Sequence, residues 1–249
     1  INKPQKALEY YEKALPILEE VGDRFGIATT LSNIGGVYYD INKPQKALEY
    51  YEKALPILEE VGDRSGVATT LNNIGEVYYD INKPQKALEY YEKALPILEE
   101  VGDRFGIATT LSNIGGVYYD INKPQKALEY YEKALPILQE VGDRFGVAAT
   151  LSNIGGVYYD INKLQKALEY YEKALPISQE VDDRSGVATT LNNIGEVYYD
   201  INKPQKALEY YEKALPILQE VGDRFGIATT LSNIGCLLYT SPSPRDGDE

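Results

Sequence analysis

The chain has 249 residues and a formal net charge of −13, from 25 Lys and Arg against 38 Asp and Glu. A balance this acidic argues against nucleic acids and anionic membrane surfaces as partners, because their phosphates would repel it. The sequence has no His, which excludes serine–histidine triads, cysteine–histidine pairs and imidazole metal sites, and its single Cys excludes an internal disulfide framework.

No apolar run approaches the length of a membrane span, and the first residues do not read as a signal peptide. A lone Cys236 is typical of a reducing compartment, so we expect a cytoplasmic protein. Neither a phosphate-binding glycine fingerprint nor a complete calcium loop is present. We therefore predict no cofactor, no metal and no enzymatic activity.

The sequence copies itself every 40 residues. The copies begin at Ile1, Ile41, Ile81, Ile121, Ile161 and Ile201. A period of this length indicates a solenoid, in which each unit buries its apolar face only against its neighbours. We therefore predict a long, thin core instead of a single globular centre.

The first predicted element is a helix over about 4–21, which returns at 44–61 and in each later unit; we name it helix B. Pro44 opens the second copy, where a missing N–H costs nothing. The apolar stripe of this copy consists of Ala47, Leu48, Tyr51, Ala54, Leu55, Leu58 and Val61. Pro56 lies inside the helix and is expected to remove one backbone hydrogen bond and to bend it.

Helix A is predicted from Arg24 to about Tyr39, again with a copy in each later unit. Gly22 suits the left-handed residue after a helix end, and Asp23 suits an N-cap. The apolar residues of helix A form one stripe, which consists of Ile27, Ala28, Leu31, Ile34 and Tyr38. Residues 41–43 form the turn to the next helix B.

Two adjacent glycines lie within helix A, in "SNIGGVYYD" over residues 32–40. We expect Gly35 to lie against helix B, where the lack of a side chain lets two backbones approach and offsets a helix-propensity cost of about 1 kcal/mol. Gly36 lies on the opposite face and becomes Glu76 and Glu196 in other units, so nothing steric requires glycine there.

The tyrosines fall mostly in "YY" pairs of both helices. Tyr38 and Tyr51 are predicted to lie in the core. Tyr39 and Tyr50 are predicted at the contacts between units, with their hydroxyls in water. A stacking site for bases is not expected on a chain this acidic.

The run "ATTLSNIGGVYYDINKPQKALEYYEKAL" resembles a tetratricopeptide repeat. The matching residues are Leu31, Ile34, Gly35, Tyr38, Ala47, Tyr51 and Ala54. The long unit is similar to one branch of this family, which includes kinesin light chains, the Leu-Gly-Asn repeat adaptors of cell polarity and bacterial repeat arrays. The resemblance implies an all-α, right-handed superhelical solenoid of antiparallel helix pairs. It places helix A on the concave wall and helix B on the convex wall.

Some residues depart from the family pattern. Leu31 stands where Trp is frequent, and Pro56 lies inside helix B. In the fifth unit, the usual Pro, core Leu and linker Gly are replaced by Leu164, Ser178 and Asp182. These changes predict a locally less stable unit within the same fold.

The predicted domain organisation is a repeat solenoid over 1–235. It comprises an unpaired helix B at 1–22, five A/B pairs over 23–222 and an unpaired helix A from 223 to 235 onward. At Cys236 the template is lost, and "CLLYTSPSPRDGDE" resembles a translated sequencing adapter. We expect 236–249 to be an unstructured, non-native tail, with a native Ser/Pro tail as the alternative.

A polar stripe lies opposite the apolar stripe of helix A, at Thr29, Ser32, Asn33, Gly36 and Asp40. By the resemblance it faces the groove of the superhelix. The asparagine recurs as Asn73, Asn113, Asn153, Asn193 and Asn233. In the long-repeat branch such a ladder of amides, each a donor and an acceptor, holds an extended peptide by its main chain. Two alternatives stay open: the amides bond a neighbouring helix or water, or near-identical units simply copy the residue.

The predicted groove is acidic. Thr29 and its equivalents, which include Thr69 and Thr109, stand where members that bind acidic C-terminal tails carry Lys. The predicted acidic wall consists of Glu76, Glu196, Asp80 and Asp120. We therefore expect a neutral or basic extended peptide, attracted by a field that weakens with salt.

The predicted function is a scaffold that binds a protein or peptide in the groove. One alternative is a structural spacer without a ligand, and another is the sensor or regulatory arm of a larger signalling or effector protein. The carboxylates of helix B are spaced as a solvated helix face, and identical units offer no unique catalytic pocket. Unpaired helices near 4–21 and 224–238 predict head-to-tail association of copies.

Overall fold

The structure, a computed structural model, describes residues 3–240. Within these residues every regular element is an α-helix. The helices are α1 (Pro4–Val21), α2 (Arg24–Asp40), α3 (Pro44–Val61), α4 (Arg64–Asp80), α5 (Pro84–Val101), α6 (Arg104–Asp120), α7 (Pro124–Val141), α8 (Arg144–Asp160), α9 (Leu164–Glu180), α10 (Arg184–Asp200), α11 (Pro204–Val221) and α12 (Arg224–Thr240). The even-numbered helices are the predicted A helices, and the odd-numbered ones are the B helices.

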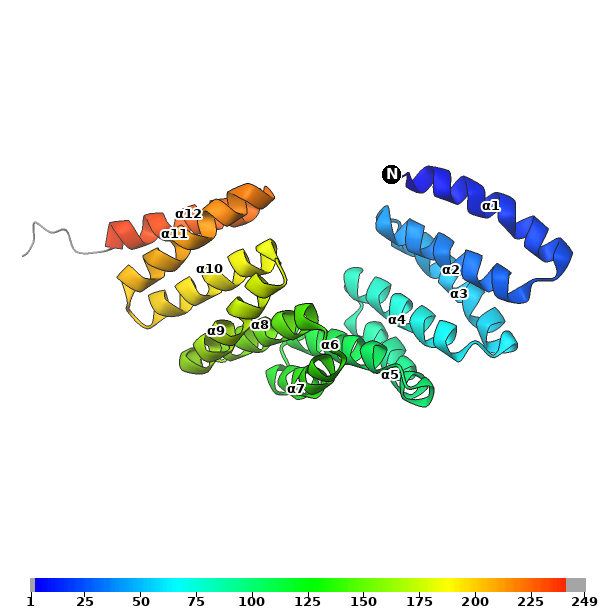
Figure 1. The fold of residues 1–249 in the computed structure, drawn as a ribbon, viewed down its shortest axis with the longest axis horizontal. Coiled ribbons are helices and arrows are strands. Elements are labelled where there is room, and N and C mark those ends of the chain that lie inside the picture. Colours follow the sequence, from blue (N-terminus) through cyan, green and yellow to red (C-terminus); the bar gives the residue numbers. More distant parts are fainter. Residues whose placement is uncertain (1–2, 241–249) are drawn as a thin grey trace, which may run out of the picture. The chain divides into compact units, whose positions relative to one another are not determined.

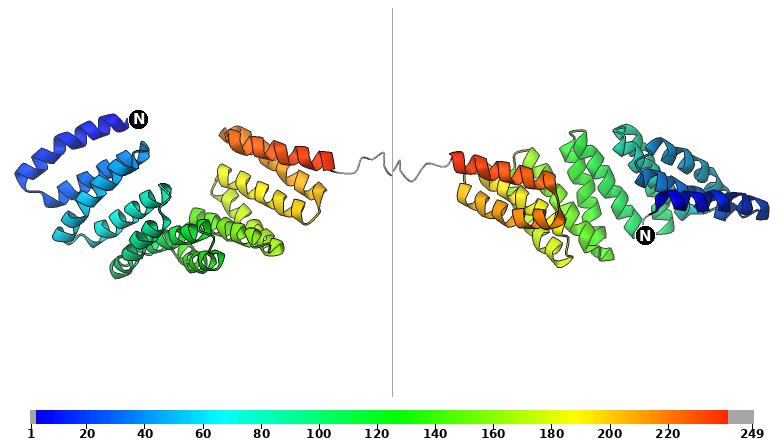
Figure 2. Two further views of the ribbon diagram at one scale, coloured as in Figure 1. Left: turned by 180° about the vertical axis from the view of Figure 1, so that it is seen from behind. Right: turned by 90° about the horizontal axis from the view of Figure 1, so that it is seen from above.

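The helices belong to two compact units, residues 1–123 with α1–α6 and residues 124–249 with α7–α12. Within each unit successive helices pack side by side in an antiparallel stack (Figures 1 and 2). Each A helix also contacts the next A helix of its unit: α2 contacts α4, α4 contacts α6, α8 contacts α10 and α10 contacts α12. The all-α solenoid of antiparallel helix pairs predicted from the repeat is confirmed.

Local chemistry sets the ends of the A helices. The Asp23 carboxylate accepts a hydrogen bond from the Gly26 N–H at 2.8 Å, and the same cap recurs at the start of the later A helices. Gly22 has φ of 73° and ends α1 in the left-handed conformation. Both predictions for this link are therefore confirmed.

The link in the fifth unit differs from the others. Asp182 takes the left-handed conformation with φ of 55°, where the other links of this kind have Gly. Helix α9 ends at Glu180 and has 17 residues, while the other helices B have 18. Ser178 is 3% exposed at a position where Leu58 and Leu218 fill the core. The fifth unit keeps the fold with less apolar burial and a strained link.

The core follows the predicted stripes with two corrections. The helix-A stripe is buried throughout. In helix B, Leu55 is only half-buried, and Val61 is 38% exposed because it is the last residue of α3, beyond the final buried residue Leu58. Pro56 is exposed, and α3 continues through it.

Gly35 packs where it was predicted to pack. A Cβ added there would lie 2.8 Å from the Tyr51 ring of the following helix B. At Gly36 the nearest atom to an added Cβ would be the Tyr51 hydroxyl, at an ordinary 3.6 Å. The first glycine is therefore required by packing, and the second position is open to substitution.

Helix α12 continues past Cys236 to Thr240, so it extends into the stretch that the sequence predicts as an unstructured tail. Residues 241–249, with Ser241 and Ser243, lie outside the described residues. None of the described helices combines the length and the hydropathy that crossing a membrane requires.

Candidate functional site

The predicted asparagines lie on successive A helices. In the first unit these are Asn33 on α2, Asn73 on α4 and Asn113 on α6. In the second unit they are Asn153 on α8, Asn193 on α10 and Asn233 on α12. Asn33 and Asn153 are exposed, and the other four are half-buried. Neighbouring A helices of a unit are in contact, so the asparagines of one unit occupy equivalent positions on adjacent helices.

Several of these amides already have a partner on a helix B. Asn73 hydrogen-bonds Tyr51, and Asn113 does the same with Tyr91. Both bonds lower the pKa of the tyrosine, while desolvation by burial raises it more; the pKa of Tyr51 is about 12. An amide bonded in this way is held in one orientation.

The position of Ser32 does not belong to the polar face. Asn72, its equivalent, accepts a hydrogen bond from the Thr110 hydroxyl at 3.0 Å, and the same contact recurs between Asn192 and Thr230 at 3.1 Å. The Ser32 hydroxyl itself is buried. The stripe drawn from helical spacing alone was wrong at this position, because the next helix A covers it.

The predicted Thr69 and Thr109 are exposed on the A helices. The Thr109 hydroxyl donates to the Phe105 carbonyl at 3.0 Å within its own helix. The predicted carboxylates Asp80 and Asp120 are also exposed. They accept hydrogen bonds from tyrosine hydroxyls of the preceding repeat, Tyr39 to Asp80 and Tyr79 to Asp120.

The outer tyrosines therefore differ from their predicted environment. Tyr39 does lie at a contact between repeats, but its hydroxyl donates to Asp80 instead of meeting only water. Tyr50 stacks on Tyr38 of the same repeat, with ring centroids 5.4 Å apart and Lys53 at 5.0 Å over its ring. Burial raises the pKa of the equivalent Tyr90, and Glu52 of the preceding helix B lies close enough for its charge to raise that pKa further, so this position contacts both its own helix A and the neighbouring repeat.

Glu76 and Glu196 carry raised pKa values. For Glu76 the causes are desolvation by its surroundings and then the charge of Asp80, against a hydrogen bond from Tyr39 that lowers the pKa. For Glu196 they are desolvation and Asp200, against a hydrogen bond with Asn233. Each glutamate lies four residues before its aspartate, so the two carboxylates share one helix face. Among the described residues, no Lys or Arg contributes to either shift.

A cavity of about 250 Å³ opens beside Glu196 in the second unit. It is lined by Tyr159, Glu196, Tyr199, Asp200, Tyr211, Asn233 and Cys236. Tyr159 comes from α8, Tyr211 from the helix B α11, and the others from α10 and α12. The Tyr159 hydroxyl donates to Asp200 at 2.8 Å, which fixes one wall. The sequence identified Glu196 and Asn233, but not the three tyrosines.

One signal for these tyrosines was available in the sequence. The hydroxyl of Tyr39 reaches an aspartate 41 residues later, and the same separation returns for Tyr79 and Tyr159. A tyrosine and an aspartate that share a separation slightly longer than the repeat belong to neighbouring A helices. Helical spacing within one repeat does not contain this information.

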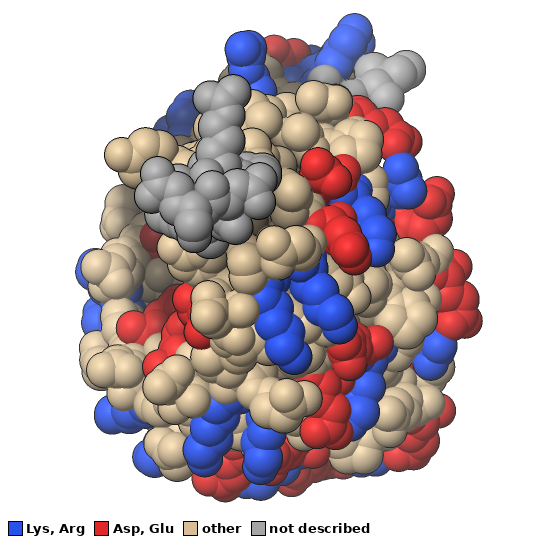
Figure 3. All heavy atoms as spheres, turned by 90° about the vertical axis from the view of Figure 1, so that its left-hand side faces the viewer, with Lys and Arg blue, Asp and Glu red and all other residues tan. Residues whose placement is uncertain are grey.

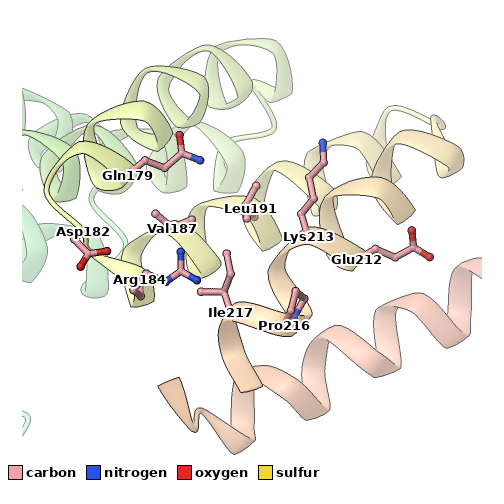
Figure 4. A pocket seen from close by; sticks show the side chains of 9 residues that line it. All are labelled: Gln179, Asp182, Arg184, Val187, Leu191, Glu212, Lys213, Pro216 and Ile217. Carbon is pink, nitrogen blue, oxygen red and sulfur yellow. The ribbon is translucent and has the colours of Figure 1, made fainter. Parts of the chain in front are cut away.

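The B helices carry a different depression in the second unit. It has a volume of about 530 Å³ and is lined by the buried Val187 and Leu191 of α10 beside Pro216 and Ile217 of α11 (Figure 4). An equivalent depression one repeat earlier has about 620 Å³. Apolar core residues line both depressions. Arg184, which also lines the first, forms an ion pair with Glu220 at 2.5 Å.

Some of the charged side chains of the B helices form ion pairs. Lys53 bonds Glu49 at 2.6 Å, and Arg24 at the start of α2 bonds Glu60 near the end of α3 at 2.5 Å. The pKa values of Glu49 and Glu60 are lowered, first by these hydrogen bonds and then by the charge of the partner. In Figure 3 basic and acidic side chains likewise lie beside one another over much of the visible face.

The two units are thus stacks of antiparallel helix pairs, which define the class of helical repeat solenoids. The chain belongs to the tetratricopeptide repeat family, which matches residues 2–60, 47–100, 66–140, 106–180, 146–220 and 186–241. The family inferred from residues such as Gly35 and Tyr38 is therefore confirmed. A comparison with curated proteins found no match.

Solved structures with the same fold come from several organisms. BtubC (BKLC) from P. vanneervenii has 24% identity and a TM-score of 0.77, and the match covers 88% of this chain and 91% of that one. A Pyrococcus horikoshii signal transduction ATPase with a tetratricopeptide repeat sensor has 21% identity and a TM-score of 0.79, over 96% of this chain and 37% of that one.

The nearly identical TPR-like repeats of a Podosopora anserina putative kinesin light chain match with 15% identity and a TM-score of 0.63, over 78% of this chain and 95% of that one. The kinesin-light-chain-like branch named from the sequence is thus represented among the structural neighbours. At these identities the similarity establishes the fold.

Proposed function

We propose that this chain is a scaffold that binds an extended segment of another protein across the A-helix face of its repeats. Membership of the tetratricopeptide repeat family supports a non-catalytic protein-interaction role in general. The observation that carries the specific proposal is the arrangement of amides and carboxylates on successive, contacting A helices.

The asparagines supply the main-chain contacts in this proposal. Each amide has one acceptor oxygen and two donor hydrogens. Where Asn113 bonds Tyr91, its remaining groups still match the alternating N–H and C=O of an extended peptide. The contact to the tyrosine reduces the conformational freedom that the amide loses on binding, so it favours the ligand contact.

The carboxylates supply the charge preference. The A helices carry Glu76, Asp80, Glu196 and Asp200. None of the groups that shift the pKa values of the two glutamates is cationic. A neutral or basic segment is therefore favoured over an acidic one, and nucleic acid and anionic membranes are disfavoured. The cytoplasmic location inferred from the single cysteine stays a prediction.

The test begins with peptides selected from a random displayed library against the whole chain. Their affinity is then measured by fluorescence anisotropy for the Asn113→Ala and Asn193→Ala variants. We expect each variant to weaken binding by about two- to tenfold, the effect of one hydrogen bond. Gln85→Ala and Gln165→Ala remove amides from exposed positions of B helices and should leave binding unchanged.

The same experiment also tests the spacer alternative. If no peptide is selected, or if all four variants bind the peptides equally while circular dichroism shows an intact fold, the A-helix face is not the binding surface. A spacer whose repeats only set length would give that outcome.

A second candidate is the sensor or regulatory arm of a larger protein. It is favoured by the Pyrococcus horikoshii structure, in which the tetratricopeptide repeats are described as the sensor of an ATPase and this chain spans 37% of that protein. The two proposals agree on ligand binding and differ in what binding controls. Sequencing the complete gene distinguishes them, because only the second requires an attached signalling or effector domain.

Association between copies also remains a proposal. Tyr10 and Ile17 on α1 are 62% and 60% exposed, and Leu231 and Leu238 on α12 are 50% and 63% exposed. Pairing α12 of one copy with α1 of another would cover these apolar side chains and could continue head to tail. Light scattering across a dilution series tests it, and a mass independent of concentration would count against it.

A further inference from the structure

The cavity beside Glu196 combines groups that recognise one kind of side chain. Three tyrosine rings and two carboxylates line a space of about 250 Å³. Aromatic faces attract cations through the ring quadrupole, and carboxylates attract them directly. The cavity therefore combines two independent kinds of cation recognition, and Asn233 adds a polar amide at its edge.

The lining is held in place before any ligand binds. Tyr159 donates to Asp200 at 2.8 Å, and Asn233 hydrogen-bonds both Glu196 and Tyr211. Gly195 permits this arrangement, because a Cβ there would lie 2.6 Å from the Tyr211 ring. The carboxylates therefore face a preformed space, and a ligand does not have to order them.

The carboxylates in the cavity are not neutralised by the protein. Glu196 is half-buried and close to the like charge of Asp200. The groups that interact with it are Asp200 on its own helix and Tyr159, Tyr211 and Asn233 on the packed helices, and none of these is cationic. Two close carboxylates repel each other, so a bound cation would relieve an unfavourable interaction as well as make favourable ones.

We propose that this cavity binds an arginine side chain of the peptide segment, with its guanidinium stacked on a tyrosine ring and paired with the carboxylates of Glu196 and Asp200. A guanidinium is planar, sheds water more readily than an ammonium ion and binds carboxylates through two parallel hydrogen bonds. Those properties match aromatic walls beside two carboxylates better than the properties of lysine do.

The first unit has equivalent residues around Glu76, with two differences: Tyr39 hydrogen-bonds Glu76 where Asn233 bonds Glu196, and Tyr79 donates to Asp120 where the second unit has Thr240. Asp80 lies four residues later, Tyr39 donates to it, and Asn113 hydrogen-bonds Tyr91. The position of Cys236 is there occupied by Gly116, so the cysteine is not needed for the site. The other A helices of the complete repeats have glycine where these two have glutamate, at Gly36, Gly116 and Gly156. By this equivalence of residues the proposal extends to a second arginine site at Glu76 in the first unit.

This inference rests on the proposed peptide binding but can be tested without a peptide. The probe is N-acetyl-arginine-methylamide, titrated into the whole chain while the tyrosine ring resonances are followed by NMR. The matched probe is the citrulline analogue, which has the same shape without the charge. We expect arginine to shift the rings of Tyr199 and Tyr211, and citrulline to bind at least about tenfold more weakly.

Two variants localise the effect. Glu196→Gly installs the residue found at Gly116 and Gly156, so the helix should form, and it should abolish the shifts at Tyr211 while those at Tyr91 remain. Glu212→Gln changes an exposed glutamate on α11 and should have no effect. Equal binding of citrulline, binding unaffected by Glu196→Gly, or a lysine analogue that binds as tightly as arginine would overturn the proposal.

The outcomes separate this inference from the proposed function. Arginine binding without any selected peptide would support the cavity and count against the scaffold. If the selected peptides contain no arginine and still bind, and if the arginine probe produces no shifts, the scaffold proposal is supported and the arginine sites are contradicted.

Discussion

Glutamates on the A helices and on the B helices have different surroundings, and their pKa values shift in opposite directions. On the B helices, glutamates such as Glu49 and Glu60 are exposed and bonded to Lys53 and Arg24, and their pKa values are lowered. On the A helices, Glu76 and Glu196 stand among tyrosines and aspartates, and their pKa values are raised. The net charge of the chain therefore does not describe either surface.

This difference indicates which surface of an acidic repeat protein is suited to binding a cationic ligand. Paired charges on an exposed helix contribute solubility and offer little to a ligand, because each already has a counter-ion. Carboxylates that lack a cationic partner, such as the half-buried Glu196, attract a cation and gain from binding it. The experiments below change one of the two surfaces or the packing between them, beginning with the largest expected effect.

The largest effect is expected from Gly195→Ala, which breaks the packing that supports the A-helix face. The added Cβ would lie 2.6 Å from the Tyr211 ring, so the ring or helix α10 must move. We expect the free energy of unfolding to fall by about 2–3 kcal/mol, as overpacking does. Urea denaturation followed by circular dichroism measures it.

The matched control is Gly36→Ala, where an added Cβ would meet its nearest neighbour at 3.6 Å. This change should stabilise the protein by up to about 1 kcal/mol through helix propensity. Equal effects of the two substitutions would show that the contact with the tyrosine ring does not require glycine.

The next effect is expected from repairing the fifth unit. Ser178→Leu restores the residue that is buried at Leu138 and Leu218, and we expect it to stabilise the protein by about 2 kcal/mol. Asp182→Gly relieves the left-handed Asp at φ 55° and should add about 1 kcal/mol or less. Thermal unfolding of the single and double variants measures both. A destabilised Ser178→Leu variant would mean that the core there differs from the other repeats.

A smaller effect is expected from neutralising the A-helix carboxylates. The folded-state pKa of Glu76 and Glu196 lies above the unfolded value, so ionisation disfavours the folded state. The free energy of unfolding should therefore rise as pH falls from 7 through the folded-state pKa toward the ordinary value of 4.5. The double variant Glu76→Gln, Glu196→Gln should be more stable than the parent at pH 7, and that difference should vanish in acid.

Thermal unfolding across this pH range measures the effect. The control is Glu49→Gln on helix B, which removes a carboxylate whose pKa is lowered and should not stabilise the protein at pH 7. If the A-helix and B-helix variants behave alike, the two surfaces do not differ in their electrostatics.

The smallest effect is expected from the ion pairs of the B helices. Lys53→Met removes the partner of Glu49, and both side chains are more than half exposed. We expect a change in stability near the detection limit of denaturation, which disappears at high salt because exposed charges are screened. Peptide affinity should not change, and a clear loss of affinity would place the ligand on the B helices.

Much of the fold could be predicted from sequence because its determinants are local. Asp23 caps its own helix, Gly22 ends the preceding one, and the spacing from Ile27 to Tyr38 marks a buried stripe. Repetition then indicates that each pair packs on the next. The prediction that Val61 is buried was wrong. It continues the apolar spacing of α3, but it is the last residue of the helix and is 38% exposed.

The candidate site could be predicted only in part because it forms between repeats. The position of Asn33 and the substitutions at Glu76 and Glu196 were visible in the sequence. The burial of Ser32 and the reach of Tyr39 to Asp80 depend on how one helix A is rotated against the next. Helical spacing within a repeat contains no information about that rotation, so the tyrosine walls of the cavity emerged only from the structure.

The most direct test of the contrast between the two surfaces is an NMR titration of the glutamate carboxyl carbons, with and without a selected basic peptide. Without peptide, the pKa values of Glu76 and Glu196 should lie above the ordinary glutamate value, and those of Glu49 and Glu60 below it. When the peptide is bound, the pKa values of Glu76 and Glu196 should fall, and those of Glu49 and Glu60 should stay the same. Ordinary pKa values at Glu76 and Glu196, or values that the peptide leaves unchanged, would contradict the account.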